Sequence, residues 1–395
     1  MTKLFMFEKP LGMRDTLPLL YEAKNKIRNK MLQEITSWGY QMIETPALEY
    51  YETVGEASAI HDQQLFKLLD QQAHTLVLRP DMTAPIARVA ASKLLKNRIP
   101  LRLAYSAKVF RAQQREGGRP AEFEQIGVEC IGNSGVSGDA ESIALLISTL
   151  QAAGLKEFKV SIGHIGFVQE LFLHILGNEE RAEQCRKFLF EKNYVGFREH
   201  VKSLHLSSID KQRILTLLNL RGTEEIFQLG KSILENEIGI HAIEELEALW
   251  HQLKEYDVQA YVSFDLTLVS HMSYYTGILF EVYTNHVGLP IGNGGRYDNL
   301  LNKFGWQSPA TGFAIMADRL LEALGELEEC NDIKCILYSK ENRKEAILLA
   351  KNLRDNGDLV VLQDISGVDD VDAFTKSFQT VQYLIGSRKE QTSYE

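Results

Sequence analysis

Two alternating segments, LRLAYSAKVFR at residues 101–111 and AEFEQIGVECI at residues 121–131, decide the fold that this sequence predicts. Apolar and polar side chains alternate along both segments, as they do in β-strands with one buried face. The loop between them, residues 112–120, is shorter than the dozen or so residues that a parallel crossover connection requires. The two segments are therefore predicted to form an antiparallel hairpin.

The period of two gives the second strand an apolar face and a polar face. The apolar face suits a core and carries Ile126, Val128 and Cys130. The polar face carries Gln125 and Glu129. Gly127 lies between them and has no side chain, so it is predicted to leave an open floor. On the first strand, Tyr105 and Arg111 share a face. Such a face suits a small ligand with a cationic group, because a carboxylate buried without a charged partner is costly. A solvent-exposed sheet face is the alternative interpretation.

The segments around the hairpin predict an α+β fold, in which helices flank an antiparallel sheet. A helical pattern begins at Pro18 and ends near Gly39. The strand pattern disappears from about residue 168 to 256, which indicates a helical insertion, and a β-α-β pattern follows near the C-terminus. We therefore divide the chain into a core of residues 1–325, which contains the insertion, and a small α/β region of residues 326–395.

The composition excludes several classes of protein. The 395 residues are 45% hydrophobic and 24% charged, which is typical of a globular protein. The formal net charge of −10 lacks the basic field of a nonspecific nucleic-acid binder. No segment matches a signal peptide or a membrane span of ~20 apolar residues. The four cysteines include no C-x-x-C pair, which argues against a disulfide framework or a zinc site. We expect a cytoplasmic protein without a metal or cofactor.

Three further segments each have a structural and a ligand-binding interpretation. Before a predicted helix, Asp81 or Thr83 either caps that helix or offers oxygen acceptors to an ammonium group. The glycines of GNGGRYD, residues 292–298, either permit tight packing or let a ligand approach, and the segment lacks the lysine of a phosphate loop. Arg319, near the start of a helix, either forms a surface ion pair or meets an anionic ligand.

As an ordered set, these segments resemble the three motifs of class II aminoacyl-tRNA synthetases. Pro46 after a long helix is similar to motif 1, residues 110–129 to motif 2 with its following strand, and residues 311–319 to motif 3. Among class II enzymes the chain resembles histidyl-tRNA synthetase over about residues 8–325. That closer resemblance is carried by LRPDMT at 78–83, YYTG at 274–277, FE at 280–281 and GGRYD at 294–298.

The resemblance implies a pocket for histidine. It assigns the α-amino group to Asp81 (where glutamate is usual), Thr83 and Gln125, and the imidazole to Glu129 and Tyr275. The complete set of expected histidine-binding residues is Asp81, Thr83, Tyr105, Arg111, Gln125, Glu129, Tyr274, Tyr275 and Tyr297. By the same resemblance, Arg111 and Arg319 mark a vestigial nucleotide site.

Departures from the synthetase pattern argue against catalysis. The arginine that precedes the tyrosine pair in working synthetases is replaced by Ser270, which supplies neither a fixed charge nor a fork of donors. Losing one preorganised transition-state donor costs ~3–4 kcal/mol. The acidic residue usual two positions after the motif 2 arginine is Gln113, and the C-terminal region is shorter than the family's anticodon-binding domain. We expect no catalytic residues in this chain.

A histidine pocket without activating residues resembles the regulatory subunits of ATP phosphoribosyltransferase, synthetase-like proteins that act at the first step of histidine biosynthesis. This resemblance implies a short-form catalytic subunit as partner in a hetero-octamer, self-association as a dimer, and histidine as the feedback effector. It implies neither a membrane nor a tRNA partner. An active histidyl-tRNA synthetase with a relocated arginine, and a stand-alone histidine- or tRNA-binding module, are the alternatives.

Overall fold

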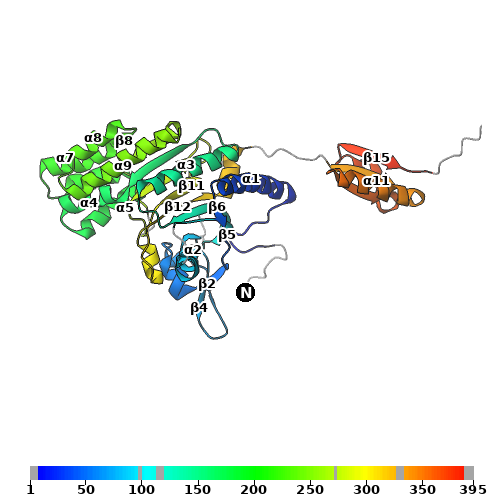
Figure 1. Cartoon of the computed structure of the whole chain (residues 1–395), viewed down its shortest axis with the longest axis horizontal. Coiled ribbons are helices and arrows are strands. Elements are labelled where there is room, and N and C mark those ends of the chain that lie inside the picture. Colours follow the sequence, from blue (N-terminus) through cyan, green and yellow to red (C-terminus); the bar gives the residue numbers. More distant parts are fainter. Residues whose placement is uncertain (1–7, 97–99, 113–119, 271–273, 326–332, 387–395) are drawn as a thin grey trace, which may run out of the picture. The chain divides into compact units, whose positions relative to one another are not determined.

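The computed structural model describes the chain in five stretches, which are residues 8–96, 100–112, 120–270, 274–325 and 333–386. The chain forms two compact units, residues 1–326 and residues 327–395, which are described separately below (Figure 1). Within the described residues, no helix combines the length and the apolar character needed to cross a bilayer.

A mainly antiparallel sheet forms the centre of the first unit. Its described strands are, in spatial order, β1 (Gln41–Met42), β5 (Leu101–Phe110), β6 (Glu122–Ile131), β12 (Ala310–Met316), β11 (Gly292–Arg296), β10 (Ile278–Tyr283), β7 (Lys159–His164), β9 (Val262–Asp265) and β8 (Arg221–Gly222). The predicted hairpin is confirmed, because β5 and β6 pair antiparallel with Tyr105 opposite Gly127. Only the β1–β5 and β7–β9 pairs of this described sheet are parallel.

Helices cover one face of this sheet. They are α1 (Pro18–Ser37), α3 (Val136–Ala152) and α10 (Ala317–Leu324). The apolar face of β6 packs against them: Ile126 and Val128 are buried in one core cluster with Met31 and Ile35 of α1. Figure 1 shows α1 and α3 on the same side of the sheet. This face accounts for the predicted core.

The opposite face carries α2 (Thr83–Val89) and a small antiparallel sheet. The strands of that small sheet are β2 (Leu48–Tyr50), β4 (Thr75–Leu78) and β3 (Lys67–Leu69). The sequence pattern gave no indication of these strands. The helix predicted after Asp81 is present: α2 continues directly into a π-helical turn at Ala90–Leu94. A second buried cluster on this face includes Tyr105 and Tyr297.

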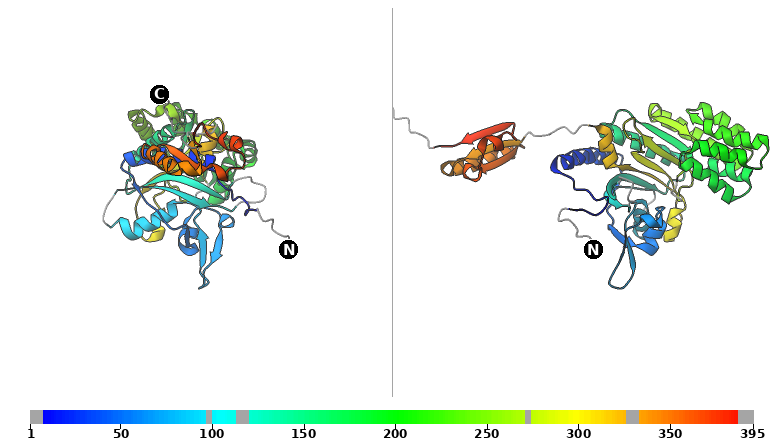
Figure 2. Two further views of the ribbon diagram at one scale, coloured as in Figure 1. Left: turned by 90° about the vertical axis from the view of Figure 1, so that its right-hand side faces the viewer. Right: turned by 180° about the vertical axis from the view of Figure 1, so that it is seen from behind.

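Helices dominate residues 165–255, as predicted for the insertion (green in Figures 1 and 2). They are α4 (Ile165–Leu176), α5 (Glu179–Phe190), α6 (Tyr194–Ser203), α7 (Ser208–Thr216), α8 (Glu225–Ser232) and α9 (Glu237–Glu255). Four of them have an N-cap residue whose side chain accepts a hydrogen bond from a backbone N–H of the first turn: Asn178, Asn193, Ser207 and Asn236. Such caps satisfy N–H groups that the helix leaves unpaired, so polar residues here set the helix starts.

The second unit has the predicted β-α-β order. Its elements are β13 (Ile333–Tyr338), α11 (Arg343–Asp355), β14 (Leu359–Asp364), α12 (Val371–Thr375) and β15 (Thr380–Leu384). The three strands are parallel, with β13 in the middle. Ile336 packs with Ala346 and Ala350 of α11 in a small core of its own.

Candidate functional site

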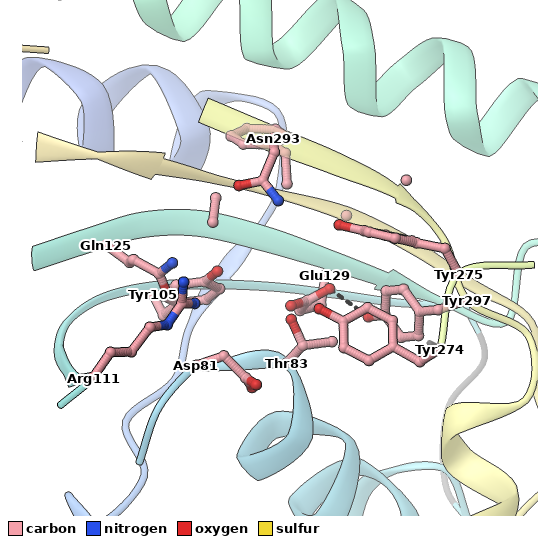
Figure 3. Close-up of a pocket in the computed structure, with 14 residues that line it drawn as sticks. Asp81, Thr83, Tyr105, Arg111, Gln125, Glu129, Tyr274, Tyr275, Asn293 and Tyr297 are labelled. Atoms are coloured by element: carbon pink, nitrogen blue, oxygen red, sulfur yellow. Dashed lines mark hydrogen bonds between the residues drawn. The ribbon is translucent and has the colours of Figure 1, made fainter. Parts of the chain in front are cut away.

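A pocket lies between the central sheet and α2 and contains all nine residues that the synthetase resemblance assigned to histidine (Figure 3). It encloses about 370 Å³, part of which is open to solvent, a size suited to a small molecule. The described lining consists of Asp81, Thr83, Tyr105, Arg111, Gln125, Glu129, Tyr274, Tyr275, Asn293, Gly295, Tyr297, Gly312, Phe313 and Ala314. The residues come from two distant parts of the sequence, 81–129 and 274–314, which the antiparallel sheet brings together.

The polar face of β6 is not a solvent-exposed sheet face. Gln125 is 3% exposed and Glu129 is 2% exposed. The alternative interpretation of this strand is therefore wrong. The face is buried because α2 and the tyrosines behind it cover the sheet at this point.

The prediction of an open floor at Gly127 is also wrong. A β-carbon at position 127 would lie 2.6 Å from the Tyr105 hydroxyl oxygen and would collide with the Phe313 carbonyl oxygen. The absent side chain therefore makes room for the Tyr105 ring and for the neighbouring strand. The space over Gly127 is therefore filled by protein atoms.

Glu129 is held deep in the pocket by neutral donors. The Tyr297 hydroxyl donates a hydrogen bond to its Oε2 atom, and Thr83 adds a second side-chain hydrogen bond. Burial, with a smaller contribution from the nearby Asp81 carboxylate, outweighs the two hydrogen bonds and raises the pKa of Glu129 to about 8. At neutral pH the free pocket therefore favours a protonated Glu129. A ligand with a positive charge or an N–H donor would stabilise the ionised form of Glu129 and so lower its pKa.

Asp81 combines the two roles considered for it. The Ala84 N–H donates to its Oδ1 atom at 3.1 Å, so one oxygen caps the start of α2. The other oxygen, Oδ2, is buried and has no hydrogen-bond partner among the described residues. Burial raises the pKa of Asp81. An unpaired buried oxygen beside a pocket is suited to accept a hydrogen bond from a ligand.

The tyrosines form a compact wall. The Tyr274 ring lies edge-on to Tyr275 at 4.9 Å between centroids and to Tyr297 at 5.8 Å. Burial raises the pKa of Tyr105, Tyr274 and Tyr297 well above the ordinary value. These hydroxyls stay neutral at physiological pH, so they can donate hydrogen bonds without adding charge.

Arg111 is the single cationic side chain in the described lining. Its Nε atom donates to the Pro80 carbonyl oxygen at 2.9 Å, and its guanidinium lies 5.4 Å from the centre of the Phe123 ring. Burial lowers the pKa of Arg111, while the Asp81 carboxylate opposes that effect. An arginine remains charged under these conditions, so the pocket has one fixed positive charge.

Other expected residues lie elsewhere. Arg319, on α10, donates to the Pro290 carbonyl oxygen at 2.5 Å and is not part of the described lining, so the two arginines of the expected nucleotide site are not brought together in this pocket. Ser270 is half-buried and also outside the described lining. Gln113 falls outside the described residues.

The GNGGRYD segment forms β11 and serves packing as well as the pocket. A β-carbon at Gly294 would collide with the Gly312 carbonyl oxygen and lie 2.5 Å from the Phe280 ring, so the tight-packing interpretation is confirmed there. Arg296 forms a buried ion pair with Asp139 at 2.6 Å. The sequence pattern did not indicate that Arg296 and Asp139 would form an ion pair.

Four lining residues were not predicted: Asn293, Gly312, Phe313 and Ala314; a fifth, Gly295, belongs to the glycine segment for which a ligand approach was one interpretation. The alternation of Ala310–Met316 with its neighbours could have indicated the residues of β12, since alternate positions of one strand share a face. The glycines of β11 hide the same alternation, because they give no apolar or polar pattern. Among the described residues, no group of three or more His, Cys, Asp and Glu side chains could hold a metal ion.

Comparisons with known families divide the chain in two. Residues 12–320 match the histidyl-tRNA synthetase family, and residues 335–386 match the C-terminal domain described as histidyl-tRNA synthetase HisZ. Two curated relatives match nearly from end to end. The chain is 63% identical over 389 residues to the ATP phosphoribosyltransferase regulatory subunit of Geobacillus sp. (strain WCH70), covering 98% of this chain and 99% of the relative. It is 58% identical over 388 residues to that of Bacillus subtilis (strain 168), with the same coverage of 98% and 99%.

Solved structures confirm the class II synthetase fold. A crystal structure of an ATP phosphoribosyltransferase regulatory subunit/histidyl-tRNA synthetase from Bacillus halodurans matches with a TM-score of 0.92 and 57% identity, covering 98% of this chain and all of that one. Histidyl-tRNA synthetase from Nostoc sp. PCC 7120 matches with a TM-score of 0.80 over 95% of this chain and 89% of that one. At 19% identity, the second match shows the fold alone.

Proposed function

The chain belongs to the family of ATP phosphoribosyltransferase regulatory subunits, and we propose that it binds histidine in the pocket between the sheet and α2 and so controls a separate catalytic subunit. The regulatory role itself follows from the family: the chain is a non-catalytic subunit of ATP phosphoribosyltransferase, an enzyme of histidine biosynthesis. The match covers both compact units, so it applies to the whole chain.

Glu129 is the observation that supports histidine as the effector. Its buried carboxylate has neutral hydrogen-bond donors but lies next to a second carboxylate, Asp81, which raises its pKa. A histidine imidazolium would supply the positively charged donor that Glu129 lacks, and a neutral imidazole would supply a further N–H donor. A hydrogen bond that involves an ionised group is stronger than one between neutral groups. Tyr275 completes this end of the pocket.

The α-amino group fits the other acceptors. Asp81 offers its unpaired Oδ2 atom, and Gln125 offers a buried Oε1 atom that also has no hydrogen-bond partner among the described residues. Thr83 stands between them and Glu129 at the start of α2. A free ammonium group has three N–H donors, so it satisfies acceptors that the protein leaves unpaired.

A protein that binds histidine without attaching it to tRNA does not need the synthetase residues that this chain lacks. Ser270 stands where a working synthetase has an arginine, and Arg319 is engaged with a backbone carbonyl away from the described lining. A pocket with one fixed positive charge can orient an amino acid carboxylate, but it offers little to a triphosphate. We propose that the pocket binds histidine without converting it to an adenylate, and that tRNA is not a partner.

Control of the partner requires two states of the assembly. Histidine regulates only if it binds one state more tightly than the other, and that difference in affinity sets the size of the effect. We propose that this chain pairs with a second copy of itself, that the pairs join short-form catalytic subunits in a hetero-octamer, and that the complex acts in the cytoplasm. Histidine bound in the pocket then favours the less active state.

Reconstitution tests this proposal. The purified chain is mixed with the short-form catalytic subunit from the same organism, and transfer of the phosphoribosyl group to ATP is followed with and without histidine. We expect activity that needs both chains and falls as histidine is added. A catalytic subunit that is equally active alone, or a purified chain that aminoacylates histidine tRNA at ordinary synthetase rates, would contradict the proposal.

A further inference from the structure

Asn293 reaches the pocket from β11, where the sequence pattern pointed to the glycines and not to this side chain. The residue is half-buried and belongs to the pocket lining. Figure 3 shows its amide turned from the strand toward the space between Gln125 and Glu129. No side-chain hydrogen bond of Asn293 occurs among the described residues. An amide has two N–H donors and one acceptor, so this side chain brings unused hydrogen-bonding capacity to the pocket.

The neighbours of Asn293 in the sheet leave room for a ligand beside it. Asn293 is paired with Ala314 on β12, and Ala314 is paired with Gly127 on β6. Residues paired across an antiparallel sheet share a face, so these three form one row. The Tyr105 ring lies over Gly127, and Ala314 ends at its β-carbon, so only a methyl group separates the Asn293 amide from that ring. Ligand atoms can therefore approach the amide along the sheet.

The distance between Asn293 and Glu129 suits one free histidine. Glu129 is paired with Gly312, and Gly312 with Gly295. Glu129 therefore lies two strands across the sheet from β11 and two residues along it from Asn293. Strand spacing and rise per residue put the two α-carbons about 12 Å apart. Both side chains reach a few ångströms into that gap. An amino acid whose imidazole meets Glu129 would then bring its backbone groups toward Asn293.

The charges of the pocket decide which of those groups Asn293 meets. Glu129 and Asp81 are two buried acids: when protonated they offer a ligand carboxylate no opposite charge, and when ionised they repel it. The opposite end has the Arg111 guanidinium and the Gln125 amide, and Figure 3 shows these two side chains together beside Tyr105, away from Tyr274, Tyr275 and Tyr297. Asn293 adds a donor near that end without adding charge. An α-carboxylate is therefore oriented toward Arg111 and Asn293, while the α-amino group turns to Asp81.

We propose that Asn293 is a specificity-determining residue whose amide donates a hydrogen bond to the α-carboxylate of the bound amino acid. This inference rests on the proposed function, because it takes histidine as the ligand. By this contact the pocket distinguishes histidine from an imidazole amine that lacks the carboxylate. Replacing the amide with a carboxylate, as in Asn293→Asp, turns an attraction into a repulsion of like charges at nearly constant size.

Calorimetry with two ligands tests the contact. Histidine and histamine, which lacks the carboxylate, are titrated into the full-length chain and into its Asn293→Asp and Asn293→Ala variants. We expect Asn293→Asp to lower the affinity for histidine at least tenfold and that for histamine less than threefold, and Asn293→Ala to weaken histidine binding alone. Asn299→Asp is the matched control, because Asn299 is exposed just beyond β11 and should change neither affinity.

Three results would overturn the inference. Equal losses for both ligands would mean that Asn293 acts on the fold or on the imidazole end, and no loss for either would mean that it makes no contact. Tighter histidine binding by Asn293→Asp would place the α-amino group there instead. Failure of the proposed function looks different, since the unmodified chain would then bind no histidine at all. Thermal unfolding of each variant identifies any loss of fold.

Discussion

Glu129 and Gly312 are paired across β6 and β12, and the Glu129 carboxylate occupies the space that a side chain at position 312 would fill. A β-carbon on Gly312 would collide both with Glu129 Oε2 and with the Val128 carbonyl oxygen. The glycine is thus required by the position of the acid. The proposed histidine site depends on this close approach of two strands.

Gly312→Ala should therefore damage the site and the fold together. We expect the free energy of unfolding to fall by about 1–3 kcal/mol, the usual cost of overpacking, and histidine binding to weaken as the carboxylate is displaced. Urea denaturation and calorimetry measure the two effects. Gly288→Ala is the control, because Gly288 is exposed and a β-carbon there meets nothing within 4 Å. Unchanged histidine affinity in Gly312→Ala would show that the ligand does not use Glu129.

Glu129→Gln should weaken histidine binding by about 1.5–3 kcal/mol, or about 10- to 150-fold, because it removes a charge-assisted hydrogen bond while keeping the side-chain shape. Isothermal titration calorimetry measures the change. Glu124→Gln is a matched control on the same strand: Glu124 is buried on the opposite face, where it pairs with Arg28 at 2.6 Å. Equal affinities for Glu129→Gln and the unmodified chain would remove Glu129 from the site.

The raised pKa of Glu129, about 8, makes the stability of the ligand-free chain depend on pH. An unfolded glutamate titrates near 4.3, so between these values the folded state holds a proton that the unfolded state has lost. The stabilising contribution of the protonated acid is complete below about pH 4.3 and is lost as the pH rises through 8. Burial is the main cause of the shift.

A comparison of unfolding free energies at pH 5, 7 and 9 checks this sign. We expect Glu129→Gln, which cannot ionise, to gain stability relative to the unmodified chain as the pH rises, by on the order of a few kcal/mol. The gain should level off above about pH 8. A difference between the two proteins that stays constant from pH 5 to pH 9 would show that Glu129 ionises normally.

The Arg296–Asp139 ion pair should matter for stability rather than for ligand affinity. Arg296 is buried, and it donates to Asp139 at 2.6 and 2.9 Å and to the carbonyl oxygens of Asn133 and Gly135. Arg296→Met leaves a buried acid without its partner, so we expect a loss of about 3–5 kcal/mol in urea denaturation. Adding Asp139→Leu should recover part of that loss. A single variant as stable as the unmodified chain would rule out this structural role.

Ser270→Arg alone should not create a synthetase. The substitution returns one cation, but Gln113 remains in motif 2 and Arg319 remains bonded to the Pro290 carbonyl. We expect histidine-dependent exchange between ATP and pyrophosphate to stay at the level of the unmodified chain. Vigorous exchange by this single variant would mean that nucleotide binding is intact.

The sequence predicted the parts of the fold that have a clear period. Alternation identified β5 and β6, and the helical pattern that begins at Pro18 identified α1. The small sheet of β2, β3 and β4 escaped prediction because its strands have only three or four residues, too few to establish a period. The change from α-helical to π-helical hydrogen bonding after Val89 also left no pattern in this apolar, alanine-rich segment.

The pocket was predicted where side chains differ in polarity along a strand, as at Gln125 and Glu129. The prediction failed at Gly127, since a missing side chain does not reveal whether a ligand or a neighbouring ring fills the space. It missed Asn293 for a related reason: the glycines of β11 conceal which positions face the pocket. Only the pairing of β11 with β12 places that amide beside the ligand space.

Histidine inhibition of the reconstituted complex is the most direct test of the whole account. For complexes that contain the unmodified chain or Glu129→Gln, one measures the histidine concentration that halves phosphoribosyl transfer relative to the same complex without histidine. The dissociation constants of histidine for the two isolated chains are measured beside it. We predict that both quantities rise together by at least tenfold. An unchanged inhibitory concentration with a weakened dissociation constant would show that the pocket binds histidine but does not control the enzyme.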